Sequence, residues 1–223
     1  MATCYVQNDR ILIRKTRRFI MNQNLTEIVF ILDRSGSMSG LENDTIGGFN
    51  GFVKNQAKAG QTSLTTVLFD DKYEILHNGI DAGDAVLTGD EYYTRGNTAL
   101  LDAVGKTIND VGKRLNETPE DLRPAKVIFV ITTDGLENAS RRFSYGEVKR
   151  MITHQTEKYN WEFIFMGANI DVAKEGDRLG ICTDNSFSYT ASPAGIGRMF
   201  ARAALACQEL RNPKPAKKKA PSA

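Results

Sequence analysis

The hydrophobic pattern alternates along the chain between short apolar runs and longer amphipathic stretches. Two uninterrupted apolar runs, residues 28–32 and the VIFVI segment within 126–132, are typical of strands buried on both faces of a parallel sheet. Apolar side chains spaced three and four residues apart predict helices elsewhere. In chain order we expect strand 28–32, helix 41–58, strands 62–69 and 73–77, a helix from Thr98, strand 126–132, helix 144–159, strand 161–166, helix 171–179, strand 186–190 and helix 193–210.

This alternation predicts an α/β domain with a doubly wound, mostly parallel central sheet and helices on both faces. Strands 62–69 and 73–77 are joined by a short polar turn that begins Asp70-Asp71. They therefore predict a hairpin, so one edge strand is expected to be antiparallel. We assign the two aspartates to this turn alone.

Three glycines interrupt helix 41–58, although glycine destabilises helix interiors. They are Gly47, Gly48 and Gly51. We interpret them as places where the helix comes close to the sheet or to a neighbouring helix. Helix 144–159 begins with a capping box formed by Ser144 and Glu147.

Length and charge indicate one folded domain with two basic ends. The chain has 223 residues, of which 41% are hydrophobic, and its formal net charge is +2. Residues 1–20 and 212–223 each carry +4, so the domain expected over 21–211 carries −6. An acidic body argues against nucleic-acid binding, whereas the basic tail suits a weak contact with polyanions. We expect 212–223 to be disordered, and 1–20 to be either a disordered extension or an untranslated leader ahead of a start at Met21.

The cysteines and the hydropathy pattern bear on location. Cys4, Cys182 and Cys207 are odd in number and widely spaced, which fits neither a disulfide framework nor a zinc site. We expect them to be buried or incidental thiols in a reducing compartment. No apolar run has membrane-spanning length, and no apolar signal core is present. The prediction is a cytoplasmic protein without membrane contact, with a monomer favoured and the oligomeric state left open.

The candidate chemistry begins where strand 28–32 ends. Asp33, Ser35 and Ser37 follow at alternate positions, with Gly36 between the two serines. A carboxylate and two hydroxyls on one tight loop form a set of oxygen ligands of the kind that Mg²⁺ prefers. The alternative is an ordinary turn in which Ser37 or Ser39 caps the next helix.

Two further loops carry a resemblance to a known family. The D-x-S-x-S pattern at 33–37, Gly-Asn-Thr at 96–98 and Thr-Asp-Gly at 133–135 resemble, in order, the three loops of the metal-ion-dependent adhesion site of von Willebrand factor A domains. The resemblance covers about residues 25–210. It implies a Mg²⁺ or Mn²⁺ site formed by Asp33, Ser35, Ser37, Thr98 and Asp134. It also implies an open metal position for an Asp or Glu carboxylate of a protein partner.

Some segments refine the resemblance. RSGSM, GNTALLDA, TDGLENAS and EFIFMGANID are more similar to bacterial intracellular homologues than to integrin domains. The resemblance therefore implies a complete adhesion-type site in a bacterial, intracellular type of von Willebrand factor A domain. We expect the loops around the site to select the partner, through side chains at Met38, Tyr93, Arg95, Leu136, Asn138 and Arg141.

Enzymatic motifs are weak in this chain, so we expect a binding protein and not an enzyme. Gly105-Lys106-Thr107 lacks the earlier glycine of a phosphate loop, and neither G-x-G-x-x-G nor G-x-S-x-G occurs. A haloacid-dehalogenase-type phosphatase needs a second aspartate where Ser35 stands. His77, at a predicted strand end, and His154, on a helix surface, are expected to be bystanders. A metal-dependent hydrolase of phosphates or esters, and a regulatory subunit of an ATPase or stress-response complex, remain as alternatives.

Overall fold

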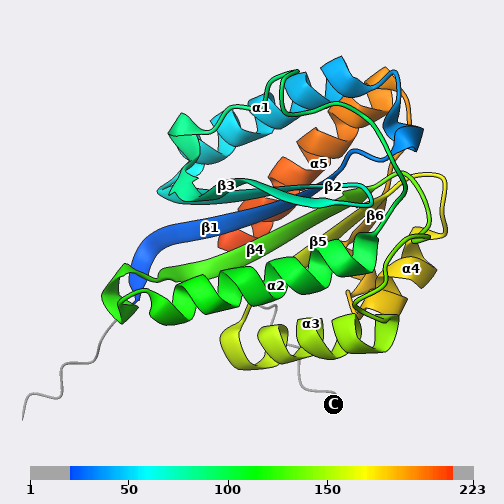
Figure 1. The fold of residues 1–223 in the computed structure, drawn as a ribbon. Coiled ribbons are helices and arrows are strands. Elements are labelled where there is room, and N and C mark those ends of the chain that lie inside the picture. Colours follow the sequence, from blue (N-terminus) through cyan, green and yellow to red (C-terminus); the bar gives the residue numbers. More distant parts are fainter. Residues whose placement is uncertain (1–20, 213–223) are drawn as a thin grey trace, which may run out of the picture.

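The structure, a computed structural model, describes residues 21–212 and consists there of one mixed sheet between two layers of helices (Figure 1). The strand order is β3-β2-β1-β4-β5-β6, and only the β2–β3 pair is antiparallel. This confirms the predicted doubly wound, mostly parallel sheet with one antiparallel edge strand. The elements are β1 Asn22–Asp33, α1 Glu42–Ala59, β2 Thr62–Phe69, β3 Tyr73–Asp81, α2 Leu100–Glu117, β4 Pro124–Thr133, α3 Tyr145–Tyr159, β5 Glu162–Gly167, α4 Val172–Leu179, β6 Ser186–Ser188 and α5 Pro193–Arg211.

Strand β1 lies at the centre of the sheet and explains why the fold has two cores. It pairs in parallel with β2 on one side and β4 on the other, and it is buried from Thr26 to Asp33. Because successive side chains of a strand point to opposite faces, Phe30 packs under α1 and α5 whereas Ile31 packs under α2, α3 and α4. The uninterrupted apolar run at 28–32 is therefore required by burial on both faces.

The two cores differ in character. Under α1 and α5, the Phe30 ring makes edge contacts with Phe49 and Phe52 and stacks on Phe200 at 5.7 Å between ring centroids. Under α2 and α3, aliphatic side chains dominate. There Phe129 stacks on Phe163 of β5 and on Trp161, the residue that precedes β5. Each helix layer thus covers its face of the sheet with its own interlocking side chains.

Most elements lie where the pattern predicts them, but several of their boundaries differ. Strand β1 begins at Asn22, six residues before the apolar run, and β3 continues to Asp81. His77 consequently lies inside β3 and not at a strand end. Helix α2 begins at Leu100, because Thr98 and Ala99 belong to the preceding loop. The capping box of α3, with Ser144 and Glu147, is confirmed.

The ends of the chain and the cysteines complete the picture. Of the predicted extensions, 1–20 and 212–223, all residues except Asn212 lie outside the described residues. Cys207 is buried beside α1 and β1, and burial raises the pKa of its thiol to about 12, whereas Cys182 is exposed. Between residues 21 and 212, none of the helices combines the length and apolarity needed to cross a bilayer.

One of the three glycines in α1 lies where the helix touches α5. A Cβ atom added to Gly48 would come within 2.2 Å of the Phe200 ring, so α1 approaches α5 closely at a position that has no side chain. The interpretation of close approach is therefore confirmed for Gly48. It is wrong for Gly47 and Gly51, where an added Cβ would meet nothing within 4 Å.

This difference predicts opposite effects from the same substitution. Gly48→Ala is expected to lower the free energy of unfolding by about 1–3 kcal/mol, because the new methyl group overpacks against Phe200. Gly51→Ala is expected to raise it by about 0.5–1 kcal/mol, because alanine favours the helix and meets open space. Urea unfolding of the two variants, side by side, measures both. Equal effects would contradict the contact between α1 and α5.

Candidate metal centre

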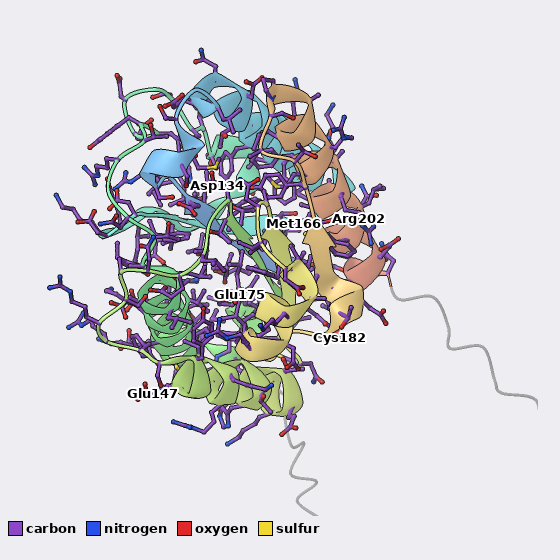
Figure 2. All side chains as sticks on the ribbon, turned by 90° about the vertical axis from the view of Figure 1, so that its right-hand side faces the viewer. Asp134, Glu147, Met166, Glu175, Cys182 and Arg202 are labelled. Carbon is purple, nitrogen blue, oxygen red and sulfur yellow. The ribbon has the colours of Figure 1, made fainter. Side chains whose placement is uncertain are left out.

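The predicted ligand loops meet at the edge of the sheet where the parallel strands end. Asp33 is the last residue of β1, and Asp134 directly follows β4, which is the strand next to β1. Figure 2 looks onto this edge, with Asp134 labelled near its upper part. Neighbouring parallel strands bring their carboxyl ends together. Asp33 and Asp134, 101 positions apart in the sequence, therefore lie in one small region.

The first loop turns tightly as soon as β1 ends. The backbone N–H of Ser35 donates to Asp33 Oδ1 at 2.7 Å, and the Ser35 and Ser37 hydroxyl oxygens lie 3.2 Å apart. A short 3-10 turn, Gly36–Met38, follows, and the Gly36 N–H donates to the carbonyl of Gly96 at 3.1 Å. The turn thus points both serine hydroxyls to one side and ties the first loop to the second.

The backbone of Thr98, in the second loop, is held by two hydrogen bonds with Asn138. The Thr98 N–H donates to Asn138 Oδ1 at 2.9 Å, and the Asn138 N–H donates to the Thr98 carbonyl at 3.0 Å. A Cβ atom added to Gly135 would lie 3.8 Å from both Ser37 Oγ and Thr98 Oγ1. The hydroxyls of the first and second loops therefore converge on the third loop.

The third loop closes the group of five predicted ligands. The Ser37 hydroxyl donates to Asp134 Oδ1 at 2.5 Å. The second oxygen of this carboxylate, Asp134 Oδ2, is buried and has no hydrogen-bond partner among the described residues. An unsatisfied buried carboxylate oxygen costs free energy. The structure thus brings together Asp33, Ser35, Ser37, Thr98 and Asp134, and leaves one buried carboxylate oxygen among them without a hydrogen-bond partner.

Burial and mutual repulsion disfavour negative charge on the two aspartates. Burial raises the pKa of Asp33 to about 6. The hydrogen bonds from Ser35 and Thr133 lower this pKa, but burial outweighs them, and the charge of Asp134 raises it further. Burial also raises the pKa of Asp134. A bound cation would compensate both carboxylates, since opposite charge favours the ionised form.

The donor set fits a hard divalent cation. It consists of carboxylate and hydroxyl oxygens only, which suit Mg²⁺ or Mn²⁺ better than soft metals. Within residues 21–212, no cluster of three or more His, Cys, Asp or Glu side chains could hold a metal. Here two carboxylates combine with three hydroxyls, so the set depends on its serines and threonine.

Buried neighbours that sequence reasoning missed hold the first two loops. Tyr92 is buried and its hydroxyl donates to the backbone carbonyl of Asp33 at 2.7 Å. Asp70, predicted only as a residue of the turn between β2 and β3, is completely buried, and its Oδ2 accepts from both Arg34 and Arg95. Burial alone would raise the pKa of Asp70, but these arginines and the Lys72 N–H hold it below its usual value. The position of Asp70 in the sequence could have indicated this role, because Asp70, like Asp33 and Asp134, comes at the end of an apolar strand segment.

The expected partner-selecting rim is only partly present. Met38 is 2% exposed and packs in the core, so its assignment to the rim is wrong. The apolar side chains of Tyr93 and Leu136 are 45% and 58% exposed. Arg141 and Asn138 are also exposed, whereas Arg95 is bound to Asp70.

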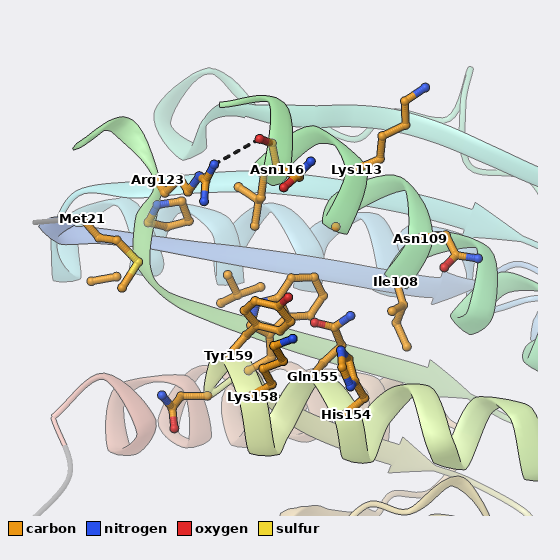
Figure 3. Close-up of a pocket in the computed structure, with 17 residues that line it drawn as sticks. Met21, Ile108, Asn109, Lys113, Asn116, Arg123, His154, Gln155, Lys158 and Tyr159 are labelled. Carbon is orange, nitrogen blue, oxygen red and sulfur yellow. Dashed lines mark hydrogen bonds between the residues drawn. The ribbon is translucent and has the colours of Figure 1, made fainter. Parts of the chain in front are cut away.

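A separate cavity of about 480 Å³ lies at the opposite end of the sheet, between α2 and α3 (Figure 3). Trp161 and Ile108 provide apolar lining, and Arg123 donates to the carbonyl of Asn116 at 3.0 Å. His154, one of the two histidines, also lines this cavity. None of the five predicted metal ligands does, so the cavity and the ligand loops are distinct features of the molecule.

Comparison with known proteins identifies the fold. No family model matches the chain, and no curated protein matches it. Solved structures do match. The vWF domain of the type V pili tip protein Mfa5 from Porphyromonas gingivalis is similar over 88% of this chain and 99% of its own, with a TM-score of 0.64 and 12% identity. This chain has a von Willebrand factor A-type fold.

Two further matches share this fold. The manganese-loaded Plasmodium vivax TRAP protein is similar over 80% of this chain and 73% of its own, with a TM-score of 0.55 and 16% identity. Proximal thread matrix protein 1 from the mussel byssus matches over 84% of this chain, with a TM-score of 0.57 and 15% identity. Only 47% of the mussel protein is covered, so this von Willebrand factor A-type chain spans about half its length.

The hydroxyl of Thr133 offers a test of how Asp33 is held. It donates to Asp33 Oδ2 at 2.7 Å inside the protein. Thr133→Val should therefore lower the free energy of unfolding by about 1–3 kcal/mol, because the buried carboxylate loses this donor. Thr132→Val is the matched control, since the Thr132 hydroxyl donates only to the Ile31 carbonyl, at 3.3 Å. Urea unfolding in EDTA should show the smaller loss for Thr132→Val, and an equal loss would contradict the assigned role of Thr133.

Proposed function

We propose that this chain is a metal-dependent protein-binding module that captures a carboxylate of a partner protein. The observation that carries the proposal is the convergence of three loops on Asp134, whose Oδ2 is buried without a partner. Hydrogen bonds satisfy the other aspartate oxygens: Ser35 and the neighbouring Thr133 donate to Asp33, and Ser37 donates to Asp134. A cation would satisfy the remaining acceptor and balance both charges.

The five side chains would bind the ion in two different ways. Asp33 and Asp134 would supply the negative charge, and Ser35, Ser37 and Thr98 would supply neutral oxygen donors. A divalent ion held mainly by neutral oxygens is a strong Lewis acid, and so attracts an anionic oxygen. Because Ser37 is exposed, the loops leave this group accessible from solvent. An aspartate or glutamate of the partner is the ligand that suits such a position.

The comparisons support divalent metal at this fold. One matching structure is manganese-loaded TRAP, and another is the mussel thread matrix protein with a zinc-occupied MIDAS motif. We propose Mg²⁺ or Mn²⁺ for this chain because its donors are all oxygens.

The surface around the site is suited to a protein partner. Tyr93 and Leu136 expose apolar side chains on the second and third loops, and Arg141 adds positive charge. Aromatic and apolar anchors near a central polar contact are typical of protein interfaces. The proposed partner therefore presents an acidic residue flanked by apolar side chains. We further propose a bacterial, cytoplasmic setting and a monomer.

A hydrolytic function has less support than binding. Hydrolysis at this site would need a nearby proton acceptor, and neither histidine is placed to serve. His77 lies within β3 next to the Thr66 hydroxyl, and His154 lines the cavity at the other end of the sheet. Tyr92 is buried behind Asp33 and donates its proton to a backbone carbonyl. No specific contact favours the role of an ATPase or stress-complex subunit.

Metal binding is the first test of the proposal. Isothermal calorimetry with Mg²⁺ should show a single site in the wild type and none in Asp33→Ala, because the variant loses one of two charged ligands. Asp177→Ala, which removes an exposed carboxylate on α4, should bind like the wild type. Metal should also stabilise the wild type, by about 2.7 kcal/mol at a hundredfold excess over the dissociation constant. Unchanged binding by Asp33→Ala would place the metal elsewhere.

Partner binding is the second test. A partner isolated on the immobilised chain in Mg²⁺ should bind at least tenfold more weakly in EDTA. Thr98→Ala should lose binding whereas Thr98→Ser should keep it, because serine retains the hydroxyl. Changing one acidic partner residue to its amide should have the effect of Thr98→Ala, since a neutral oxygen is a poorer ligand for a hard cation. Equal affinity in Mg²⁺ and EDTA would show that the partner docks away from the metal.

A further inference from the structure

A second cluster of charged side chains lies directly behind the ligand loops, around Asp70. This residue follows β2 at the same edge of the sheet as Asp33 and Asp134, and it is 0% exposed. Its Oδ2 accepts from Arg34 Nε at 3.1 Å and from Arg95 Nε at 2.6 Å. Its Oδ1 accepts from the Lys72 N–H at 2.6 Å. One buried carboxylate thus joins two guanidinium groups.

The two arginines come from two different ligand loops. Arg34 stands between Asp33 and Ser35 in the first loop, and its side chain is completely buried. It also donates to Glu74 Oε2 at 2.7 Å and to the carbonyl of Glu91 at 3.2 Å. Arg95 stands three residues before Thr98 in the second loop. Asp70 therefore contacts both loops through their arginines.

Backbone hydrogen bonds run along the same connection. The Arg34 N–H donates to the Phe69 carbonyl at 2.8 Å, and the Arg95 N–H donates to the Arg34 carbonyl at 2.9 Å. The Ala99 N–H, next to Thr98, donates to the carbonyl of Asp70 itself at 2.9 Å. The first loop, the second loop and the end of β2 are consequently bound together around Asp70.

The charges of this cluster also matter for a cation site. Arg34 is adjacent in sequence to Asp33, and an uncompensated guanidinium there would repel a divalent ion. Two arginines meet two carboxylates, Asp70 and Glu74, so the cluster is neutral as a whole. Removing the Asp70 charge would leave the buried Arg34 with only one of its two carboxylate partners, Glu74, which is unfavourable. The Arg34 side chain would then have to move toward water, and Ser35 would move with it.

We propose that Asp70 is a positioning residue: it fixes Arg34 and Arg95 so that the first and second ligand loops are already arranged for metal before metal binds. This inference rests on the proposed metal site. It assigns to Asp70 a role in metal affinity that acts through other residues, since Asp70 itself is not among the five ligands. Positioning of this kind raises affinity because less ordering is needed on binding.

The test compares Asp70→Asn with Glu27→Gln. Glu27 is also fully buried and paired with an arginine, Arg114, but it lies six residues before the end of β1, about 20 Å from Asp33. Both variants should lose stability. Calorimetry with Mg²⁺ should show a dissociation constant at least tenfold higher in Asp70→Asn and within twofold of the wild type in Glu27→Gln. Equal dissociation constants in the two variants would overturn the proposal.

A second readout needs no metal. Amide hydrogen exchange in EDTA should be at least tenfold faster for Gly36 and Ala99 in Asp70→Asn, since these N–H groups form the bonds that join the loops. Exchange at both amides should stay near the wild-type rate in Glu27→Gln. Unchanged exchange in Asp70→Asn would overturn the proposal. If the wild type bound no Mg²⁺, the proposed function would fail, whereas the exchange rates would still decide whether Asp70 orders the loops.

If Asp70→Asn does not fold, Arg95 provides a milder variant, because its side chain is 30% exposed. Arg95→Met should raise the Mg²⁺ dissociation constant severalfold and speed exchange at Ala99. Arg95→Lys, which keeps the charge next to Asp70, should recover part of the affinity. No change in Arg95→Met, in either measurement, would count against the proposal.

Discussion

The structure depends on balancing three carboxylates that are buried at one edge of the sheet. Asp33, Asp70 and Asp134 end or directly follow β1, β2 and β4, which are neighbours in the sheet. Each is compensated differently: Asp70 by two arginines, Asp33 by an N–H group and a hydroxyl, and Asp134 by one hydroxyl. The compensation decreases in that order. The carboxylate charge is therefore least well compensated at Asp134, where the hydroxyls from the other two loops converge.

Much of this arrangement follows from the sequence because its causes are local. The apolar run at 28–32 identifies the central strand, since only burial on both faces tolerates such a run. Parallel pairing then places the residues after β1 and β4 at the same edge, so Asp33 and Asp134 can be expected to meet. Spacing alone identified Ser35 and Ser37, whereas Thr98 was assigned through the family resemblance. The structure brings all five together.

The parts that the sequence did not reveal depend on contacts between distant residues. Arg34 and Asp70 are 36 positions apart, and nothing in either segment indicates that they pair. A turn between strands is sufficient to account for an aspartate, which is why the sequence predicts no further role for Asp70. The prediction for Met38 is wrong because the side chain was expected at the surface of a loop, whereas the 3-10 turn at Gly36–Met38 directs it into the core. Charge pairing and turn direction are thus decided by the tertiary structure.

The strand order has a consequence for when this centre comes into existence. The hydrogen bonds from Ser37 to Asp134 and from Thr133 to Asp33 join residues 97 and 100 positions apart. During synthesis on the ribosome, a nascent chain that has not yet exposed β4 has only the first two loops, and β1 lacks its partner on one side. The third loop arrives only after the first two loops, β2 and β3 have been made. The centre is thus assembled late, and contacts of such long range form slowly. A cation that needs all three loops would be bound only by chains in which β4 has already paired with β1.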